Sequence, residues 1–427
     1  MWKDCKRKPV PEVETPVCIT GMGVLSPCGN SPDSLVDALL AGRSGVTLYP
    51  GDESLGLAPA VVGALQEIPE WGLSKPQQAS LDRCSRLALA AAHQAMGDAG
   101  LSLSGDQGLQ AGIAWGTGMG GIHSLEDAYR QLFERQSQRL RPLTVVMAMH
   151  NAAAAHIAMA HGLRGPSVTF SNACASSAMA IGEGARWIRQ GLAEVVLVGG
   201  ADAPLTPATL RAWQAMATLA TPDPAAPQTS CRPFAADRSG LVLAEGAGAL
   251  VLESPAHARA RGARIHGELL GYGSSCDASH LSHPAVDGQV RAMTQALAEA
   301  GLGPEAVGYV NAHGTATRVG DQVEAAAIAQ VLGNRVPVSS TKALHGHCMG
   351  ATGAVEFIAS LTALARGRLL PAWHREQADP ACDLAWVAPE SRQAPASSVF
   401  LSNSFAFGGS NGVLVARAGA GDSAASL

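Results

Sequence analysis

The chain has 427 residues, of which 47% are hydrophobic and 15% are charged, and its formal net charge is −5. This composition is typical of a compact globular protein with a large buried core. It offers no basic block for nucleic acid, and no apolar run reaches the ~20 residues of a membrane-spanning helix. The nine cysteines form no CxxC pair and the charged residues 1–14 do not resemble a secretory signal, so we expect free thiols in a soluble, cytoplasmic protein.

Along the chain, short β-branched runs alternate with Ala-rich runs of helical period. The pattern predicts strands over residues 17–23, 111–116, 167–170, 194–200, 246–253, 308–311, 336–339 and 399–402. It predicts helices over residues 31–41, 81–97, 288–300, 321–332 and 351–365, and another directly after residue 174. Strands separated by helices indicate an α/β protein in which helices cover the sheets.

Cys174 stands in the segment SNACASS, between the predicted strand 167–170 and the helix that follows. The N-terminus of a helix presents free N–H groups and partial positive charge, which favour a thiolate over a thiol. The position therefore predicts an activated nucleophile, whose backbone N–H helps to hold an oxyanion. A small buried hydrophobe is the alternative, because most free cysteines are of that kind.

Two glycine-flanked segments of the second half carry histidines. The first, NAHGTAT from residue 311, places His313 at the end of a predicted strand, and a histidine satisfied within a turn is the alternative. The second, SSTKALHGHCMG from residue 339, gathers Lys342, His345 and His347. No Asp, Glu or Cys/His framework accompanies them, so we expect no metal site.

A third segment, SNSFAFGGSNG from residue 402, precedes a last predicted strand. Its glycines permit positive φ and can aim backbone N–H groups at an anion, although a plain tight turn gives the same pattern. Asp321 and Glu324 lie near the start of a predicted helix, in a spacing close to that of a capping box. A buried ion pair between Glu324 and Lys342 is the alternative interpretation of that pair.

Together these segments resemble the β-ketoacyl-[acyl-carrier-protein] synthases, the elongating condensing enzymes of fatty-acid and type II polyketide pathways. The likeness runs from about residue 16 to 417 in the family's order, and also includes GLRGPS before Cys174, RPF from Arg232 and EGAGALVLE from Glu245. It implies the thiolase-like α/β fold, with duplicated βαβαβαββ halves in a five-layered α/β/α/β/α arrangement. We therefore divide the chain into an extension (1–15), an N-terminal half (16–265), a C-terminal half (266–417) and a tail (418–427) that we expect to be disordered.

The resemblance implies an acyltransferase that catalyses decarboxylative Claisen condensation of an enzyme-bound acyl thioester with malonyl-carrier protein. Cys174 would take the acyl chain from phosphopantetheine, and His313 and His347 would bind the malonyl thioester carbonyl and stabilise the enolate. The N–H groups of Cys174 and Phe407 would form the oxyanion hole, and the Phe407 ring would gate the nucleophile. Lys342 and Glu324 would support His347. The substrate contacts implied are Thr315 and Thr317 on the phosphopantetheine arm, Met119 at the acyl pocket, and Phe405.

The implied partners are an acyl carrier protein and a second subunit, either another copy or a chain-length-factor-like protein. No cofactor is expected beyond the carrier's phosphopantetheine, apart from a structural monovalent cation near Asn311 and Glu356. An active ketosynthase half of a heterodimer in a specialised pathway is one alternative. A thiolase is another, but its second cysteine is expected in the final glycine-rich loop, where Phe407 stands. The acyl chain length, the starter unit and the pathway are not determined by the sequence.

The sequence departs from the family at three places. Ala406 stands where glycine is usual before the gate, and His345 replaces a common threonine and adds a titratable group. The segment 75–86 is poorer in basic residues than the usual carrier-docking face. Arg139 and Arg141 are candidates for attracting an acidic carrier, with solvated surface charge as the alternative interpretation.

Overall fold

A computed structural model describes residues 15–69, 73–103, 105–223, 225–390 and 393–419 of the chain. The predicted extension, apart from residue 15, and residues 420–427 of the predicted tail therefore lie outside the described residues. The main sheet has eleven strands in the order β12-β11-β10-β13-β14-β9-β1-β8-β6-β4-β5. In chain order these are β1 (Val17–Leu25), β4 (Ala111–Gly116), β5 (Ser167–Phe170), β6 (Val195–Asp202), β8 (Gly246–Glu253), β9 (Gly267–Cys276), β10 (Tyr309–Asn311), β11 (Pro337–Ser339), β12 (Ala385–Trp386), β13 (Val399–Phe405) and β14 (Ser410–Ala418).

The main sheet consists of two similar parts, one from each half of the chain. In the first half, β5, β4 and β6 are parallel, and β8 and β1 complete the order as antiparallel strands. In the second half, β11, β10 and β13 are parallel, and β14 and β9 follow as antiparallel strands. The parts meet where β1 pairs with β9 over three residue pairs. The predicted duplication is confirmed, since each half has the succession βαβαβαββ.

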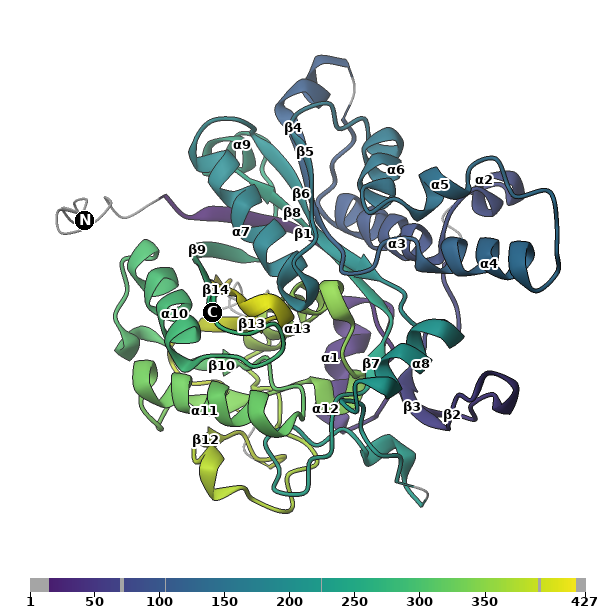
Figure 1. The fold of residues 1–427 in the computed structure, drawn as a ribbon. Helices are drawn as coiled ribbons and strands as arrows, with labels where there is room; N and C mark the ends of the chain where they lie inside the picture. The colour runs from purple at the N-terminus through teal and green to yellow at the C-terminus, as the bar shows by residue number, and fades with distance from the viewer. Residues whose placement is uncertain (1–14, 70–72, 104, 224, 391–392, 420–427) are drawn as a thin grey trace, which may run out of the picture.

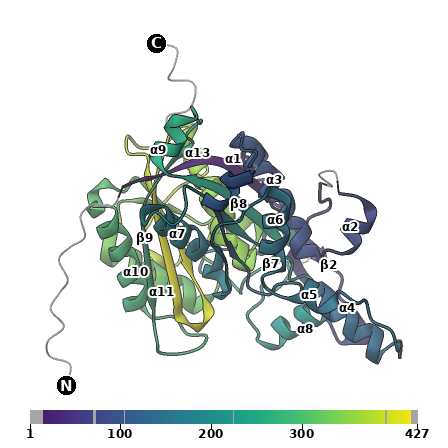
Figure 2. The same cartoon turned by 90° about the horizontal axis from the view of Figure 1, so that it is seen from above.

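Two helices lie between the parts of the sheet. α7 (Ser176–Arg189) contacts β4 and β6 on one side and β9 and β14 on the other, and α13 (Thr352–Ala365) contacts β1, β8, β13 and β14. α3 (Arg83–Asp98) and α6 (Ala152–His161) cover the outer face of the first half, and α10 (Val286–Glu299) and α11 (Arg318–Leu332) cover that of the second (Figures 1 and 2). The result is the predicted five-layered α/β/α/β/α order.

Small residues allow the central helices to approach the strands closely. A Cβ added at Gly182 of α7 would lie 2.2 Å from the ring of Tyr272 on β9. α13 is buried over nearly its whole length, as expected for a helix that is apolar on all sides. The two halves therefore share one core layer, and the N-terminal ends of α7 and α13 lie close to each other through the turns that precede them.

The sequence pattern missed β9 and three longer or projecting helices of the first half, namely α4 (Ile122–Phe133), α5 (Thr144–Ala148) and α6. β9 lacks a clear apolar alternation because Gly271 and Gly273 occupy the face that packs against α10. A Cβ there would lie 2.2 and 1.9 Å from backbone oxygens of α10, so close packing demands glycine. α4 and α5 project from the body in both views (Figures 1 and 2).

The remaining elements are short. A small sheet is formed by β2 (Val46–Tyr49), β3 (Ala60–Gly63) and β7 (Leu243–Ala244). The other helices are α1 (Pro32–Ala41), α2 (Lys75–Ala79), α8 (Pro207–Ala215), α9 (Pro255–Ala260) and α12 (Lys342–His345). Among the described residues, no helix is long and apolar enough to cross a membrane.

Candidate active site

The turn that carries Cys174 joins β5 to α7. Ala173 adopts a positive φ of 47°, and residues 173–175 form a short 3₁₀ turn directly before the helix. The hydroxyl of Ser176 accepts the Asn172 N–H at 2.8 Å and donates to the Ala173 carbonyl at 2.6 Å. These bonds fix the turn, so Cys174 lies at a helix start as predicted.

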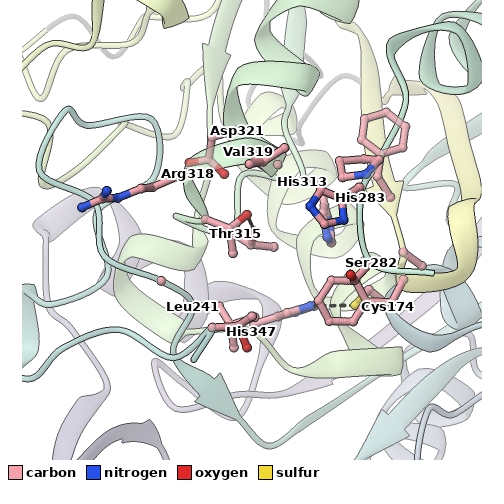
Figure 3. A pocket seen from close by; sticks show the side chains of 18 of the residues that line it. Cys174, Leu241, Ser282, His283, His313, Thr315, Arg318, Val319, Asp321 and His347 are labelled. Carbon is pink, nitrogen blue, oxygen red and sulfur yellow. Dashed lines mark hydrogen bonds between the residues drawn. The ribbon is translucent and has the colours of Figure 1, made fainter. Parts of the chain in front are cut away.

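Cys174, His313 and His347 meet in one buried cluster. The Nε2 atom of His347 lies 2.9 Å from the Cys174 Sγ (Figure 3). Its Nδ1 lies 2.9 Å from the Thr352 hydroxyl. The His313 ring is nearly perpendicular to that of His347, with ring centroids 5.3 Å apart. Sγ and one ring nitrogen from each histidine all lie within 4.8 Å of one another. The fold thus brings together one residue of the first half and two of the second.

Burial decides the protonation of this cluster. It lowers the pKa of His313 and of His347 well below the ordinary value, and the charge of Lys342 lowers both further. Burial also raises the pKa of the Cys174 thiol to about 12, although Lys342 opposes that shift. At neutral pH the site therefore holds a thiol beside neutral imidazoles. The thiolate expected from the helix start is not the resting form, because burial outweighs the helix end.

Two backbone N–H groups act on the Cys174 thiol. Those of Phe407 and of Cys174 itself lower the pKa of the thiol, against the larger effect of burial. Their role as an oxyanion hole stays a prediction. Phe407 lies in a turn between β13 and β14 in which Gly408 and Gly409 have φ of 83° and 74°, conformations that favour glycine. The Phe407 ring stacks on Trp213, with centroids 6.0 Å apart.

Lys342 is fully buried and is held by Glu356 rather than by Glu324. Its Nζ lies 2.7 and 2.8 Å from the two Glu356 oxygens and also donates to the His313 carbonyl. The alternative of a Glu324–Lys342 ion pair is therefore wrong. Both Glu324 oxygens are instead engaged at 2.7 Å by the N–H groups of His313 and Gly314. Lys342 and Glu324 thus hold the main chain of His313, whereas the sequence suggested support of His347.

The capping-box interpretation of Asp321 and Glu324 is also wrong. α11 begins at Arg318, so Asp321 is already within the helix. Its carboxylate accepts the N–H of Phe234 at 2.7 Å and so ties the helix to a loop of the first half.

A cavity of about 660 Å³ leads from Cys174 to the surface. The predicted residues Thr315, Thr317 and Phe405 line it, and the two threonine hydroxyls lie 3.1 Å apart. Met119 does not line this cavity. It belongs to the turn after β4, where its N–H binds Asp202 at 3.0 Å.

Sequence reasoning missed Asp202 and Thr352, and it assigned Glu356 only to a cation. The fully buried Asp202 carboxylate accepts the N–H groups of Gly118 at 2.7 Å and of Gly350 at 2.6 Å, and so joins the two halves beside the nucleophile. Two features of the sequence could have indicated these roles. Asp202 ends an otherwise apolar strand, and Glu356 lies inside an otherwise apolar helix.

The departures at His345 and Ala406 are accommodated without new charge or strain. Burial lowers the pKa of His345 to about 3, and its Nε2 lies 2.9 Å from the Thr341 hydroxyl. It is therefore neutral near pH 7. Ala406 has φ −117° and ψ 155°, an extended conformation that does not require glycine.

The duplicated body and the paired histidines define the class of protein. It is a thiolase-like condensing enzyme, because a cysteine nucleophile faces two histidines and Phe407 occupies the loop where a thiolase is expected to have its second cysteine. The N-terminal domain of the β-ketoacyl synthases matches residues 14–258, and their C-terminal domain matches residues 266–376. The chain belongs to the β-ketoacyl synthase family and is an acyltransferase of the condensing type.

Individual relatives cover nearly the whole chain. Nodulation protein E of Rhizobium meliloti (strain 1021) is 43% identical over 401 residues, which is 93% of this chain and 98% of the relative. The 3-oxoacyl-[acyl-carrier-protein] synthase 2 of Staphylococcus aureus (strain N315) is 36% identical over 405 residues, 93% of this chain and 97% of the relative. The solved ishigamide ketosynthase/chain length factor is 34% identical with a TM-score of 0.86, covering 95% of this chain and 100% of that one.

Proposed function

We propose that this chain is the catalytic subunit that elongates carrier-bound acyl groups with malonyl-carrier protein. The observation that carries the proposal is the convergence of Cys174, His313 and His347 within 4.8 Å. The N–H groups of Cys174 and Phe407, which lower the pKa of the thiol, are the expected donors to the oxyanion that thioester chemistry forms. The carrier is inferred from the name of the Staphylococcus aureus relative.

In the first half-reaction, the acyl thioester enters the cavity along Thr315 and Thr317. The Cys174 Sγ attacks the thioester carbonyl carbon while the thiol proton moves to Nε2 of His347, 2.9 Å away. The carbonyl oxygen becomes an oxyanion and is held by the N–H groups of Cys174 and Phe407. When the intermediate collapses, the C–S bond to the carrier breaks, and its thiol leaves with the proton from His347.

In the second half-reaction, the thioester carbonyl of the malonyl group accepts hydrogen bonds from His313 and from Nε2 of His347. For this step His347 carries its proton on Nε2, and Nδ1 accepts from the Thr352 hydroxyl. The bond to the malonyl carboxylate breaks, CO₂ leaves, and the electron pair forms an enolate. Neutral imidazole N–H donors suit this step, and both rings are neutral because burial lowers their pKa. The enolate carbon then attacks the acyl carbonyl carbon on Cys174, the C–S bond to Sγ breaks, and the released thiolate takes a proton from water to restore the resting thiol.

The direct test uses intact-mass spectrometry. The purified protein is incubated with acyl-carrier protein and then with malonyl-carrier protein, across a set of chain lengths. We expect a covalent acyl adduct on Cys174, followed by a β-ketoacyl product on the carrier and loss of the adduct. Product formation with no adduct at Cys174, or absence of the adduct with every chain offered, would overturn the proposal.

We further infer that a second subunit covers the projecting helices. β5 is the terminal strand of the described sheet, and Val168 on it is 42% exposed. The neighbouring surface has an unusual density of exposed apolar side chains, namely Tyr129, Leu132, Phe133, Leu143, Val145, Val146 and Met149. Similarity to the ishigamide ketosynthase/chain length factor favours a chain-length-factor-like partner, and a second copy of this chain is the other candidate. Light scattering of the chain alone and after co-expression with such a factor separates the two.

Three further expectations stay proposals. Arg139 and Arg141 are exposed and available to an acidic carrier, whereas Arg83 in segment 75–86 is bound by Glu245 at 2.5 Å.

A cytoplasmic location fits the eight described cysteines, all of which are free. A monovalent cation fits Asn311, whose buried amide lacks a partner, but fits Glu356 poorly, because both carboxylate oxygens bind Lys342.

A further inference from the structure

The cluster of Cys174, His313 and His347 also has the composition of a zinc site. Among the described residues it is the one group of three His, Cys, Asp or Glu side chains whose ligand atoms converge this closely, within 4.8 Å. One sulfur and two imidazole nitrogens form a borderline-soft donor set of the kind that binds Zn²⁺ and leaves a fourth position open. We propose that the unacylated site binds one Zn²⁺ ion reversibly through these three side chains, and that the bound ion excludes the acyl group.

The geometry requires ligand movements of about 1 Å, because the three ligand atoms now lie within 4.8 Å of one another. Zn–S and Zn–N bonds of about 2.3 and 2.0–2.1 Å place sulfur and nitrogen about 3.6 Å apart in a tetrahedral site. Sγ and Nε2 of His347 are now 2.9 Å apart, so they separate by about 0.7 Å when the ion replaces the shared proton. That proton leaves to the buffer as the Zn–S bond forms. All three side chains line the cavity, so a fourth ligand can reach the ion from there.

The surroundings hold the ligands ready. The hydroxyl of Thr352 binds Nδ1 of His347 and so keeps Nε2 directed at Sγ, which is the outer-shell support that zinc-binding histidines have. His313 is positioned through its main chain by Glu324. The positive charge of Lys342 acts against a cation here, and the paired Glu356 carboxylate offsets it in part.

The consequence is mutual exclusion at one atom. Sγ cannot carry an acyl group and bind the ion at the same time, so Zn²⁺ blocks acylation and shields the thiol from alkylation. This inference goes beyond the proposed function and does not depend on it, because the ligand set binds Zn²⁺ whatever acyl group the enzyme accepts.

The test measures metal binding directly on the full chain. Chelator-treated protein is titrated with Zn²⁺ against a chromophoric chelator, and separately with Co²⁺, whose thiolate ligation gives a charge-transfer absorption band. We expect one ion per chain and the thiolate band in the native protein. Cys174→Ala should abolish the band, and Cys174→Ala and His347→Ala should each weaken Zn²⁺ binding by more than ~100-fold, since loss of an outer-shell partner alone costs about 10–100-fold.

Matched controls separate this site from surface ligands. His280 and His283 form an exposed pair with Nδ1 atoms 3.0 Å apart, and Cys276 is an exposed thiol. The H280A/H283A double variant and Cys276→Ala should keep the ion and the band. Unchanged Zn²⁺ affinity in Cys174→Ala, or a Co²⁺ complex without the thiolate band, would overturn the metal proposal. Acyl loading measured in metal-free buffer tests the proposed function separately, so either can fail alone.

Discussion

At the scale of single residues, the position of one proton between Cys174 and His347 controls reactivity. The thiol keeps it at rest, because burial raises the pKa of the sulfur to about 12 and lowers that of the imidazole. When a substrate thioester is bound, loss of the thiol proton accompanies attack by Sγ. The negative charge then forms on the substrate carbonyl oxygen, at the expected oxyanion hole, instead of on the sulfur. Activation therefore accompanies substrate binding rather than preceding it.

The first prediction concerns the pH dependence of Cys174 alkylation. Because the thiol pKa is raised to about 12, the thiolate fraction and the alkylation rate should rise about tenfold per pH unit from about pH 7 to 10. Site-resolved mass spectrometry with iodoacetamide measures this, in a Cys276→Ala background that removes the exposed thiol. A plateau near pH 8 would show a thiolate already formed at rest.

The second prediction concerns the nucleophile itself. Cys174→Ala should abolish the covalent acyl adduct and leave the unfolding midpoint nearly unchanged, because alanine fits the space of the buried cysteine. Intact mass and thermal unfolding give the two readouts. Persistence of the adduct in the variant contradicts the assignment.

The third prediction separates the two histidines. His313→Ala should reduce malonyl decarboxylation by about 10²–10³-fold and change acylation much less, since it removes a donor to the enolate but not the contact with Sγ. His347→Ala should lower both half-reactions, because its Nε2 takes the thiol proton. Separate assays of CO₂ release and adduct formation measure the split, and equal losses in His313→Ala would argue against the enolate role.

At the scale of elements, α13 links the two functions of the site. Thr352 and Glu356 are one turn apart on this helix, and they bind His347 and Lys342 respectively. The helix therefore orients a catalytic ring and neutralises a buried charge from one face. α13 lies between the two halves, and strands of both halves pack against it. This packing holds Thr352 and Glu356 in fixed positions.

The fourth prediction tests this buried ion pair. Glu356→Gln leaves the Lys342 ammonium unmatched in the core and should lower the free energy of unfolding by about 3–5 kcal/mol. Ser360→Ala, one turn further along α13, is the matched control and should change it by about 1 kcal/mol. Urea unfolding measures both, and equal effects would show that the charge is not the cause.

Much of the fold and site could be predicted, and the misses have physical causes. Cys174 stands at a helix start, and His313 and His347 stand beside glycines, so the local pattern located them and the resemblance assigned their roles. Glu356 was not recognised as the partner of Lys342. A carboxylate within an apolar helix indicates a buried partner, but the sequence does not identify that partner. β9 was missed because its glycines are required by close packing against α10. That contact joins segments distant in sequence, so the residues around β9 do not reveal it.

At the scale of the whole molecule, we infer that a partner covers the exposed apolar surface of α4 and α5. Phe133 on α4 is 73% exposed and Val145 on α5 is 67% exposed, and both helices project from the body of the fold (Figures 1 and 2). A surface of this kind is stable in water when a partner covers it.

The fifth prediction follows from that surface. A Phe133→Glu and Val145→Glu double variant should dissociate the assembly, because it places two charges in an apolar interface. Ile265→Glu, at a 39% exposed position between α9 and β9, is the control and should leave the mass unchanged. Sedimentation velocity measures the mass, and an intact assembly in the double variant places the contact elsewhere.

The carboxylate of Asp202 has a consequence for how this protein can be divided. It holds Gly118 from one half and Gly350 from the other, while the fully buried stretch of α13 is covered by strands of both. A chain cut between residues 265 and 266 would give two polypeptides, each with an uncovered apolar helix. Expressed separately they should aggregate, and expressed together they should reassemble by fragment complementation, with Cys174 supplied by one piece and both histidines by the other.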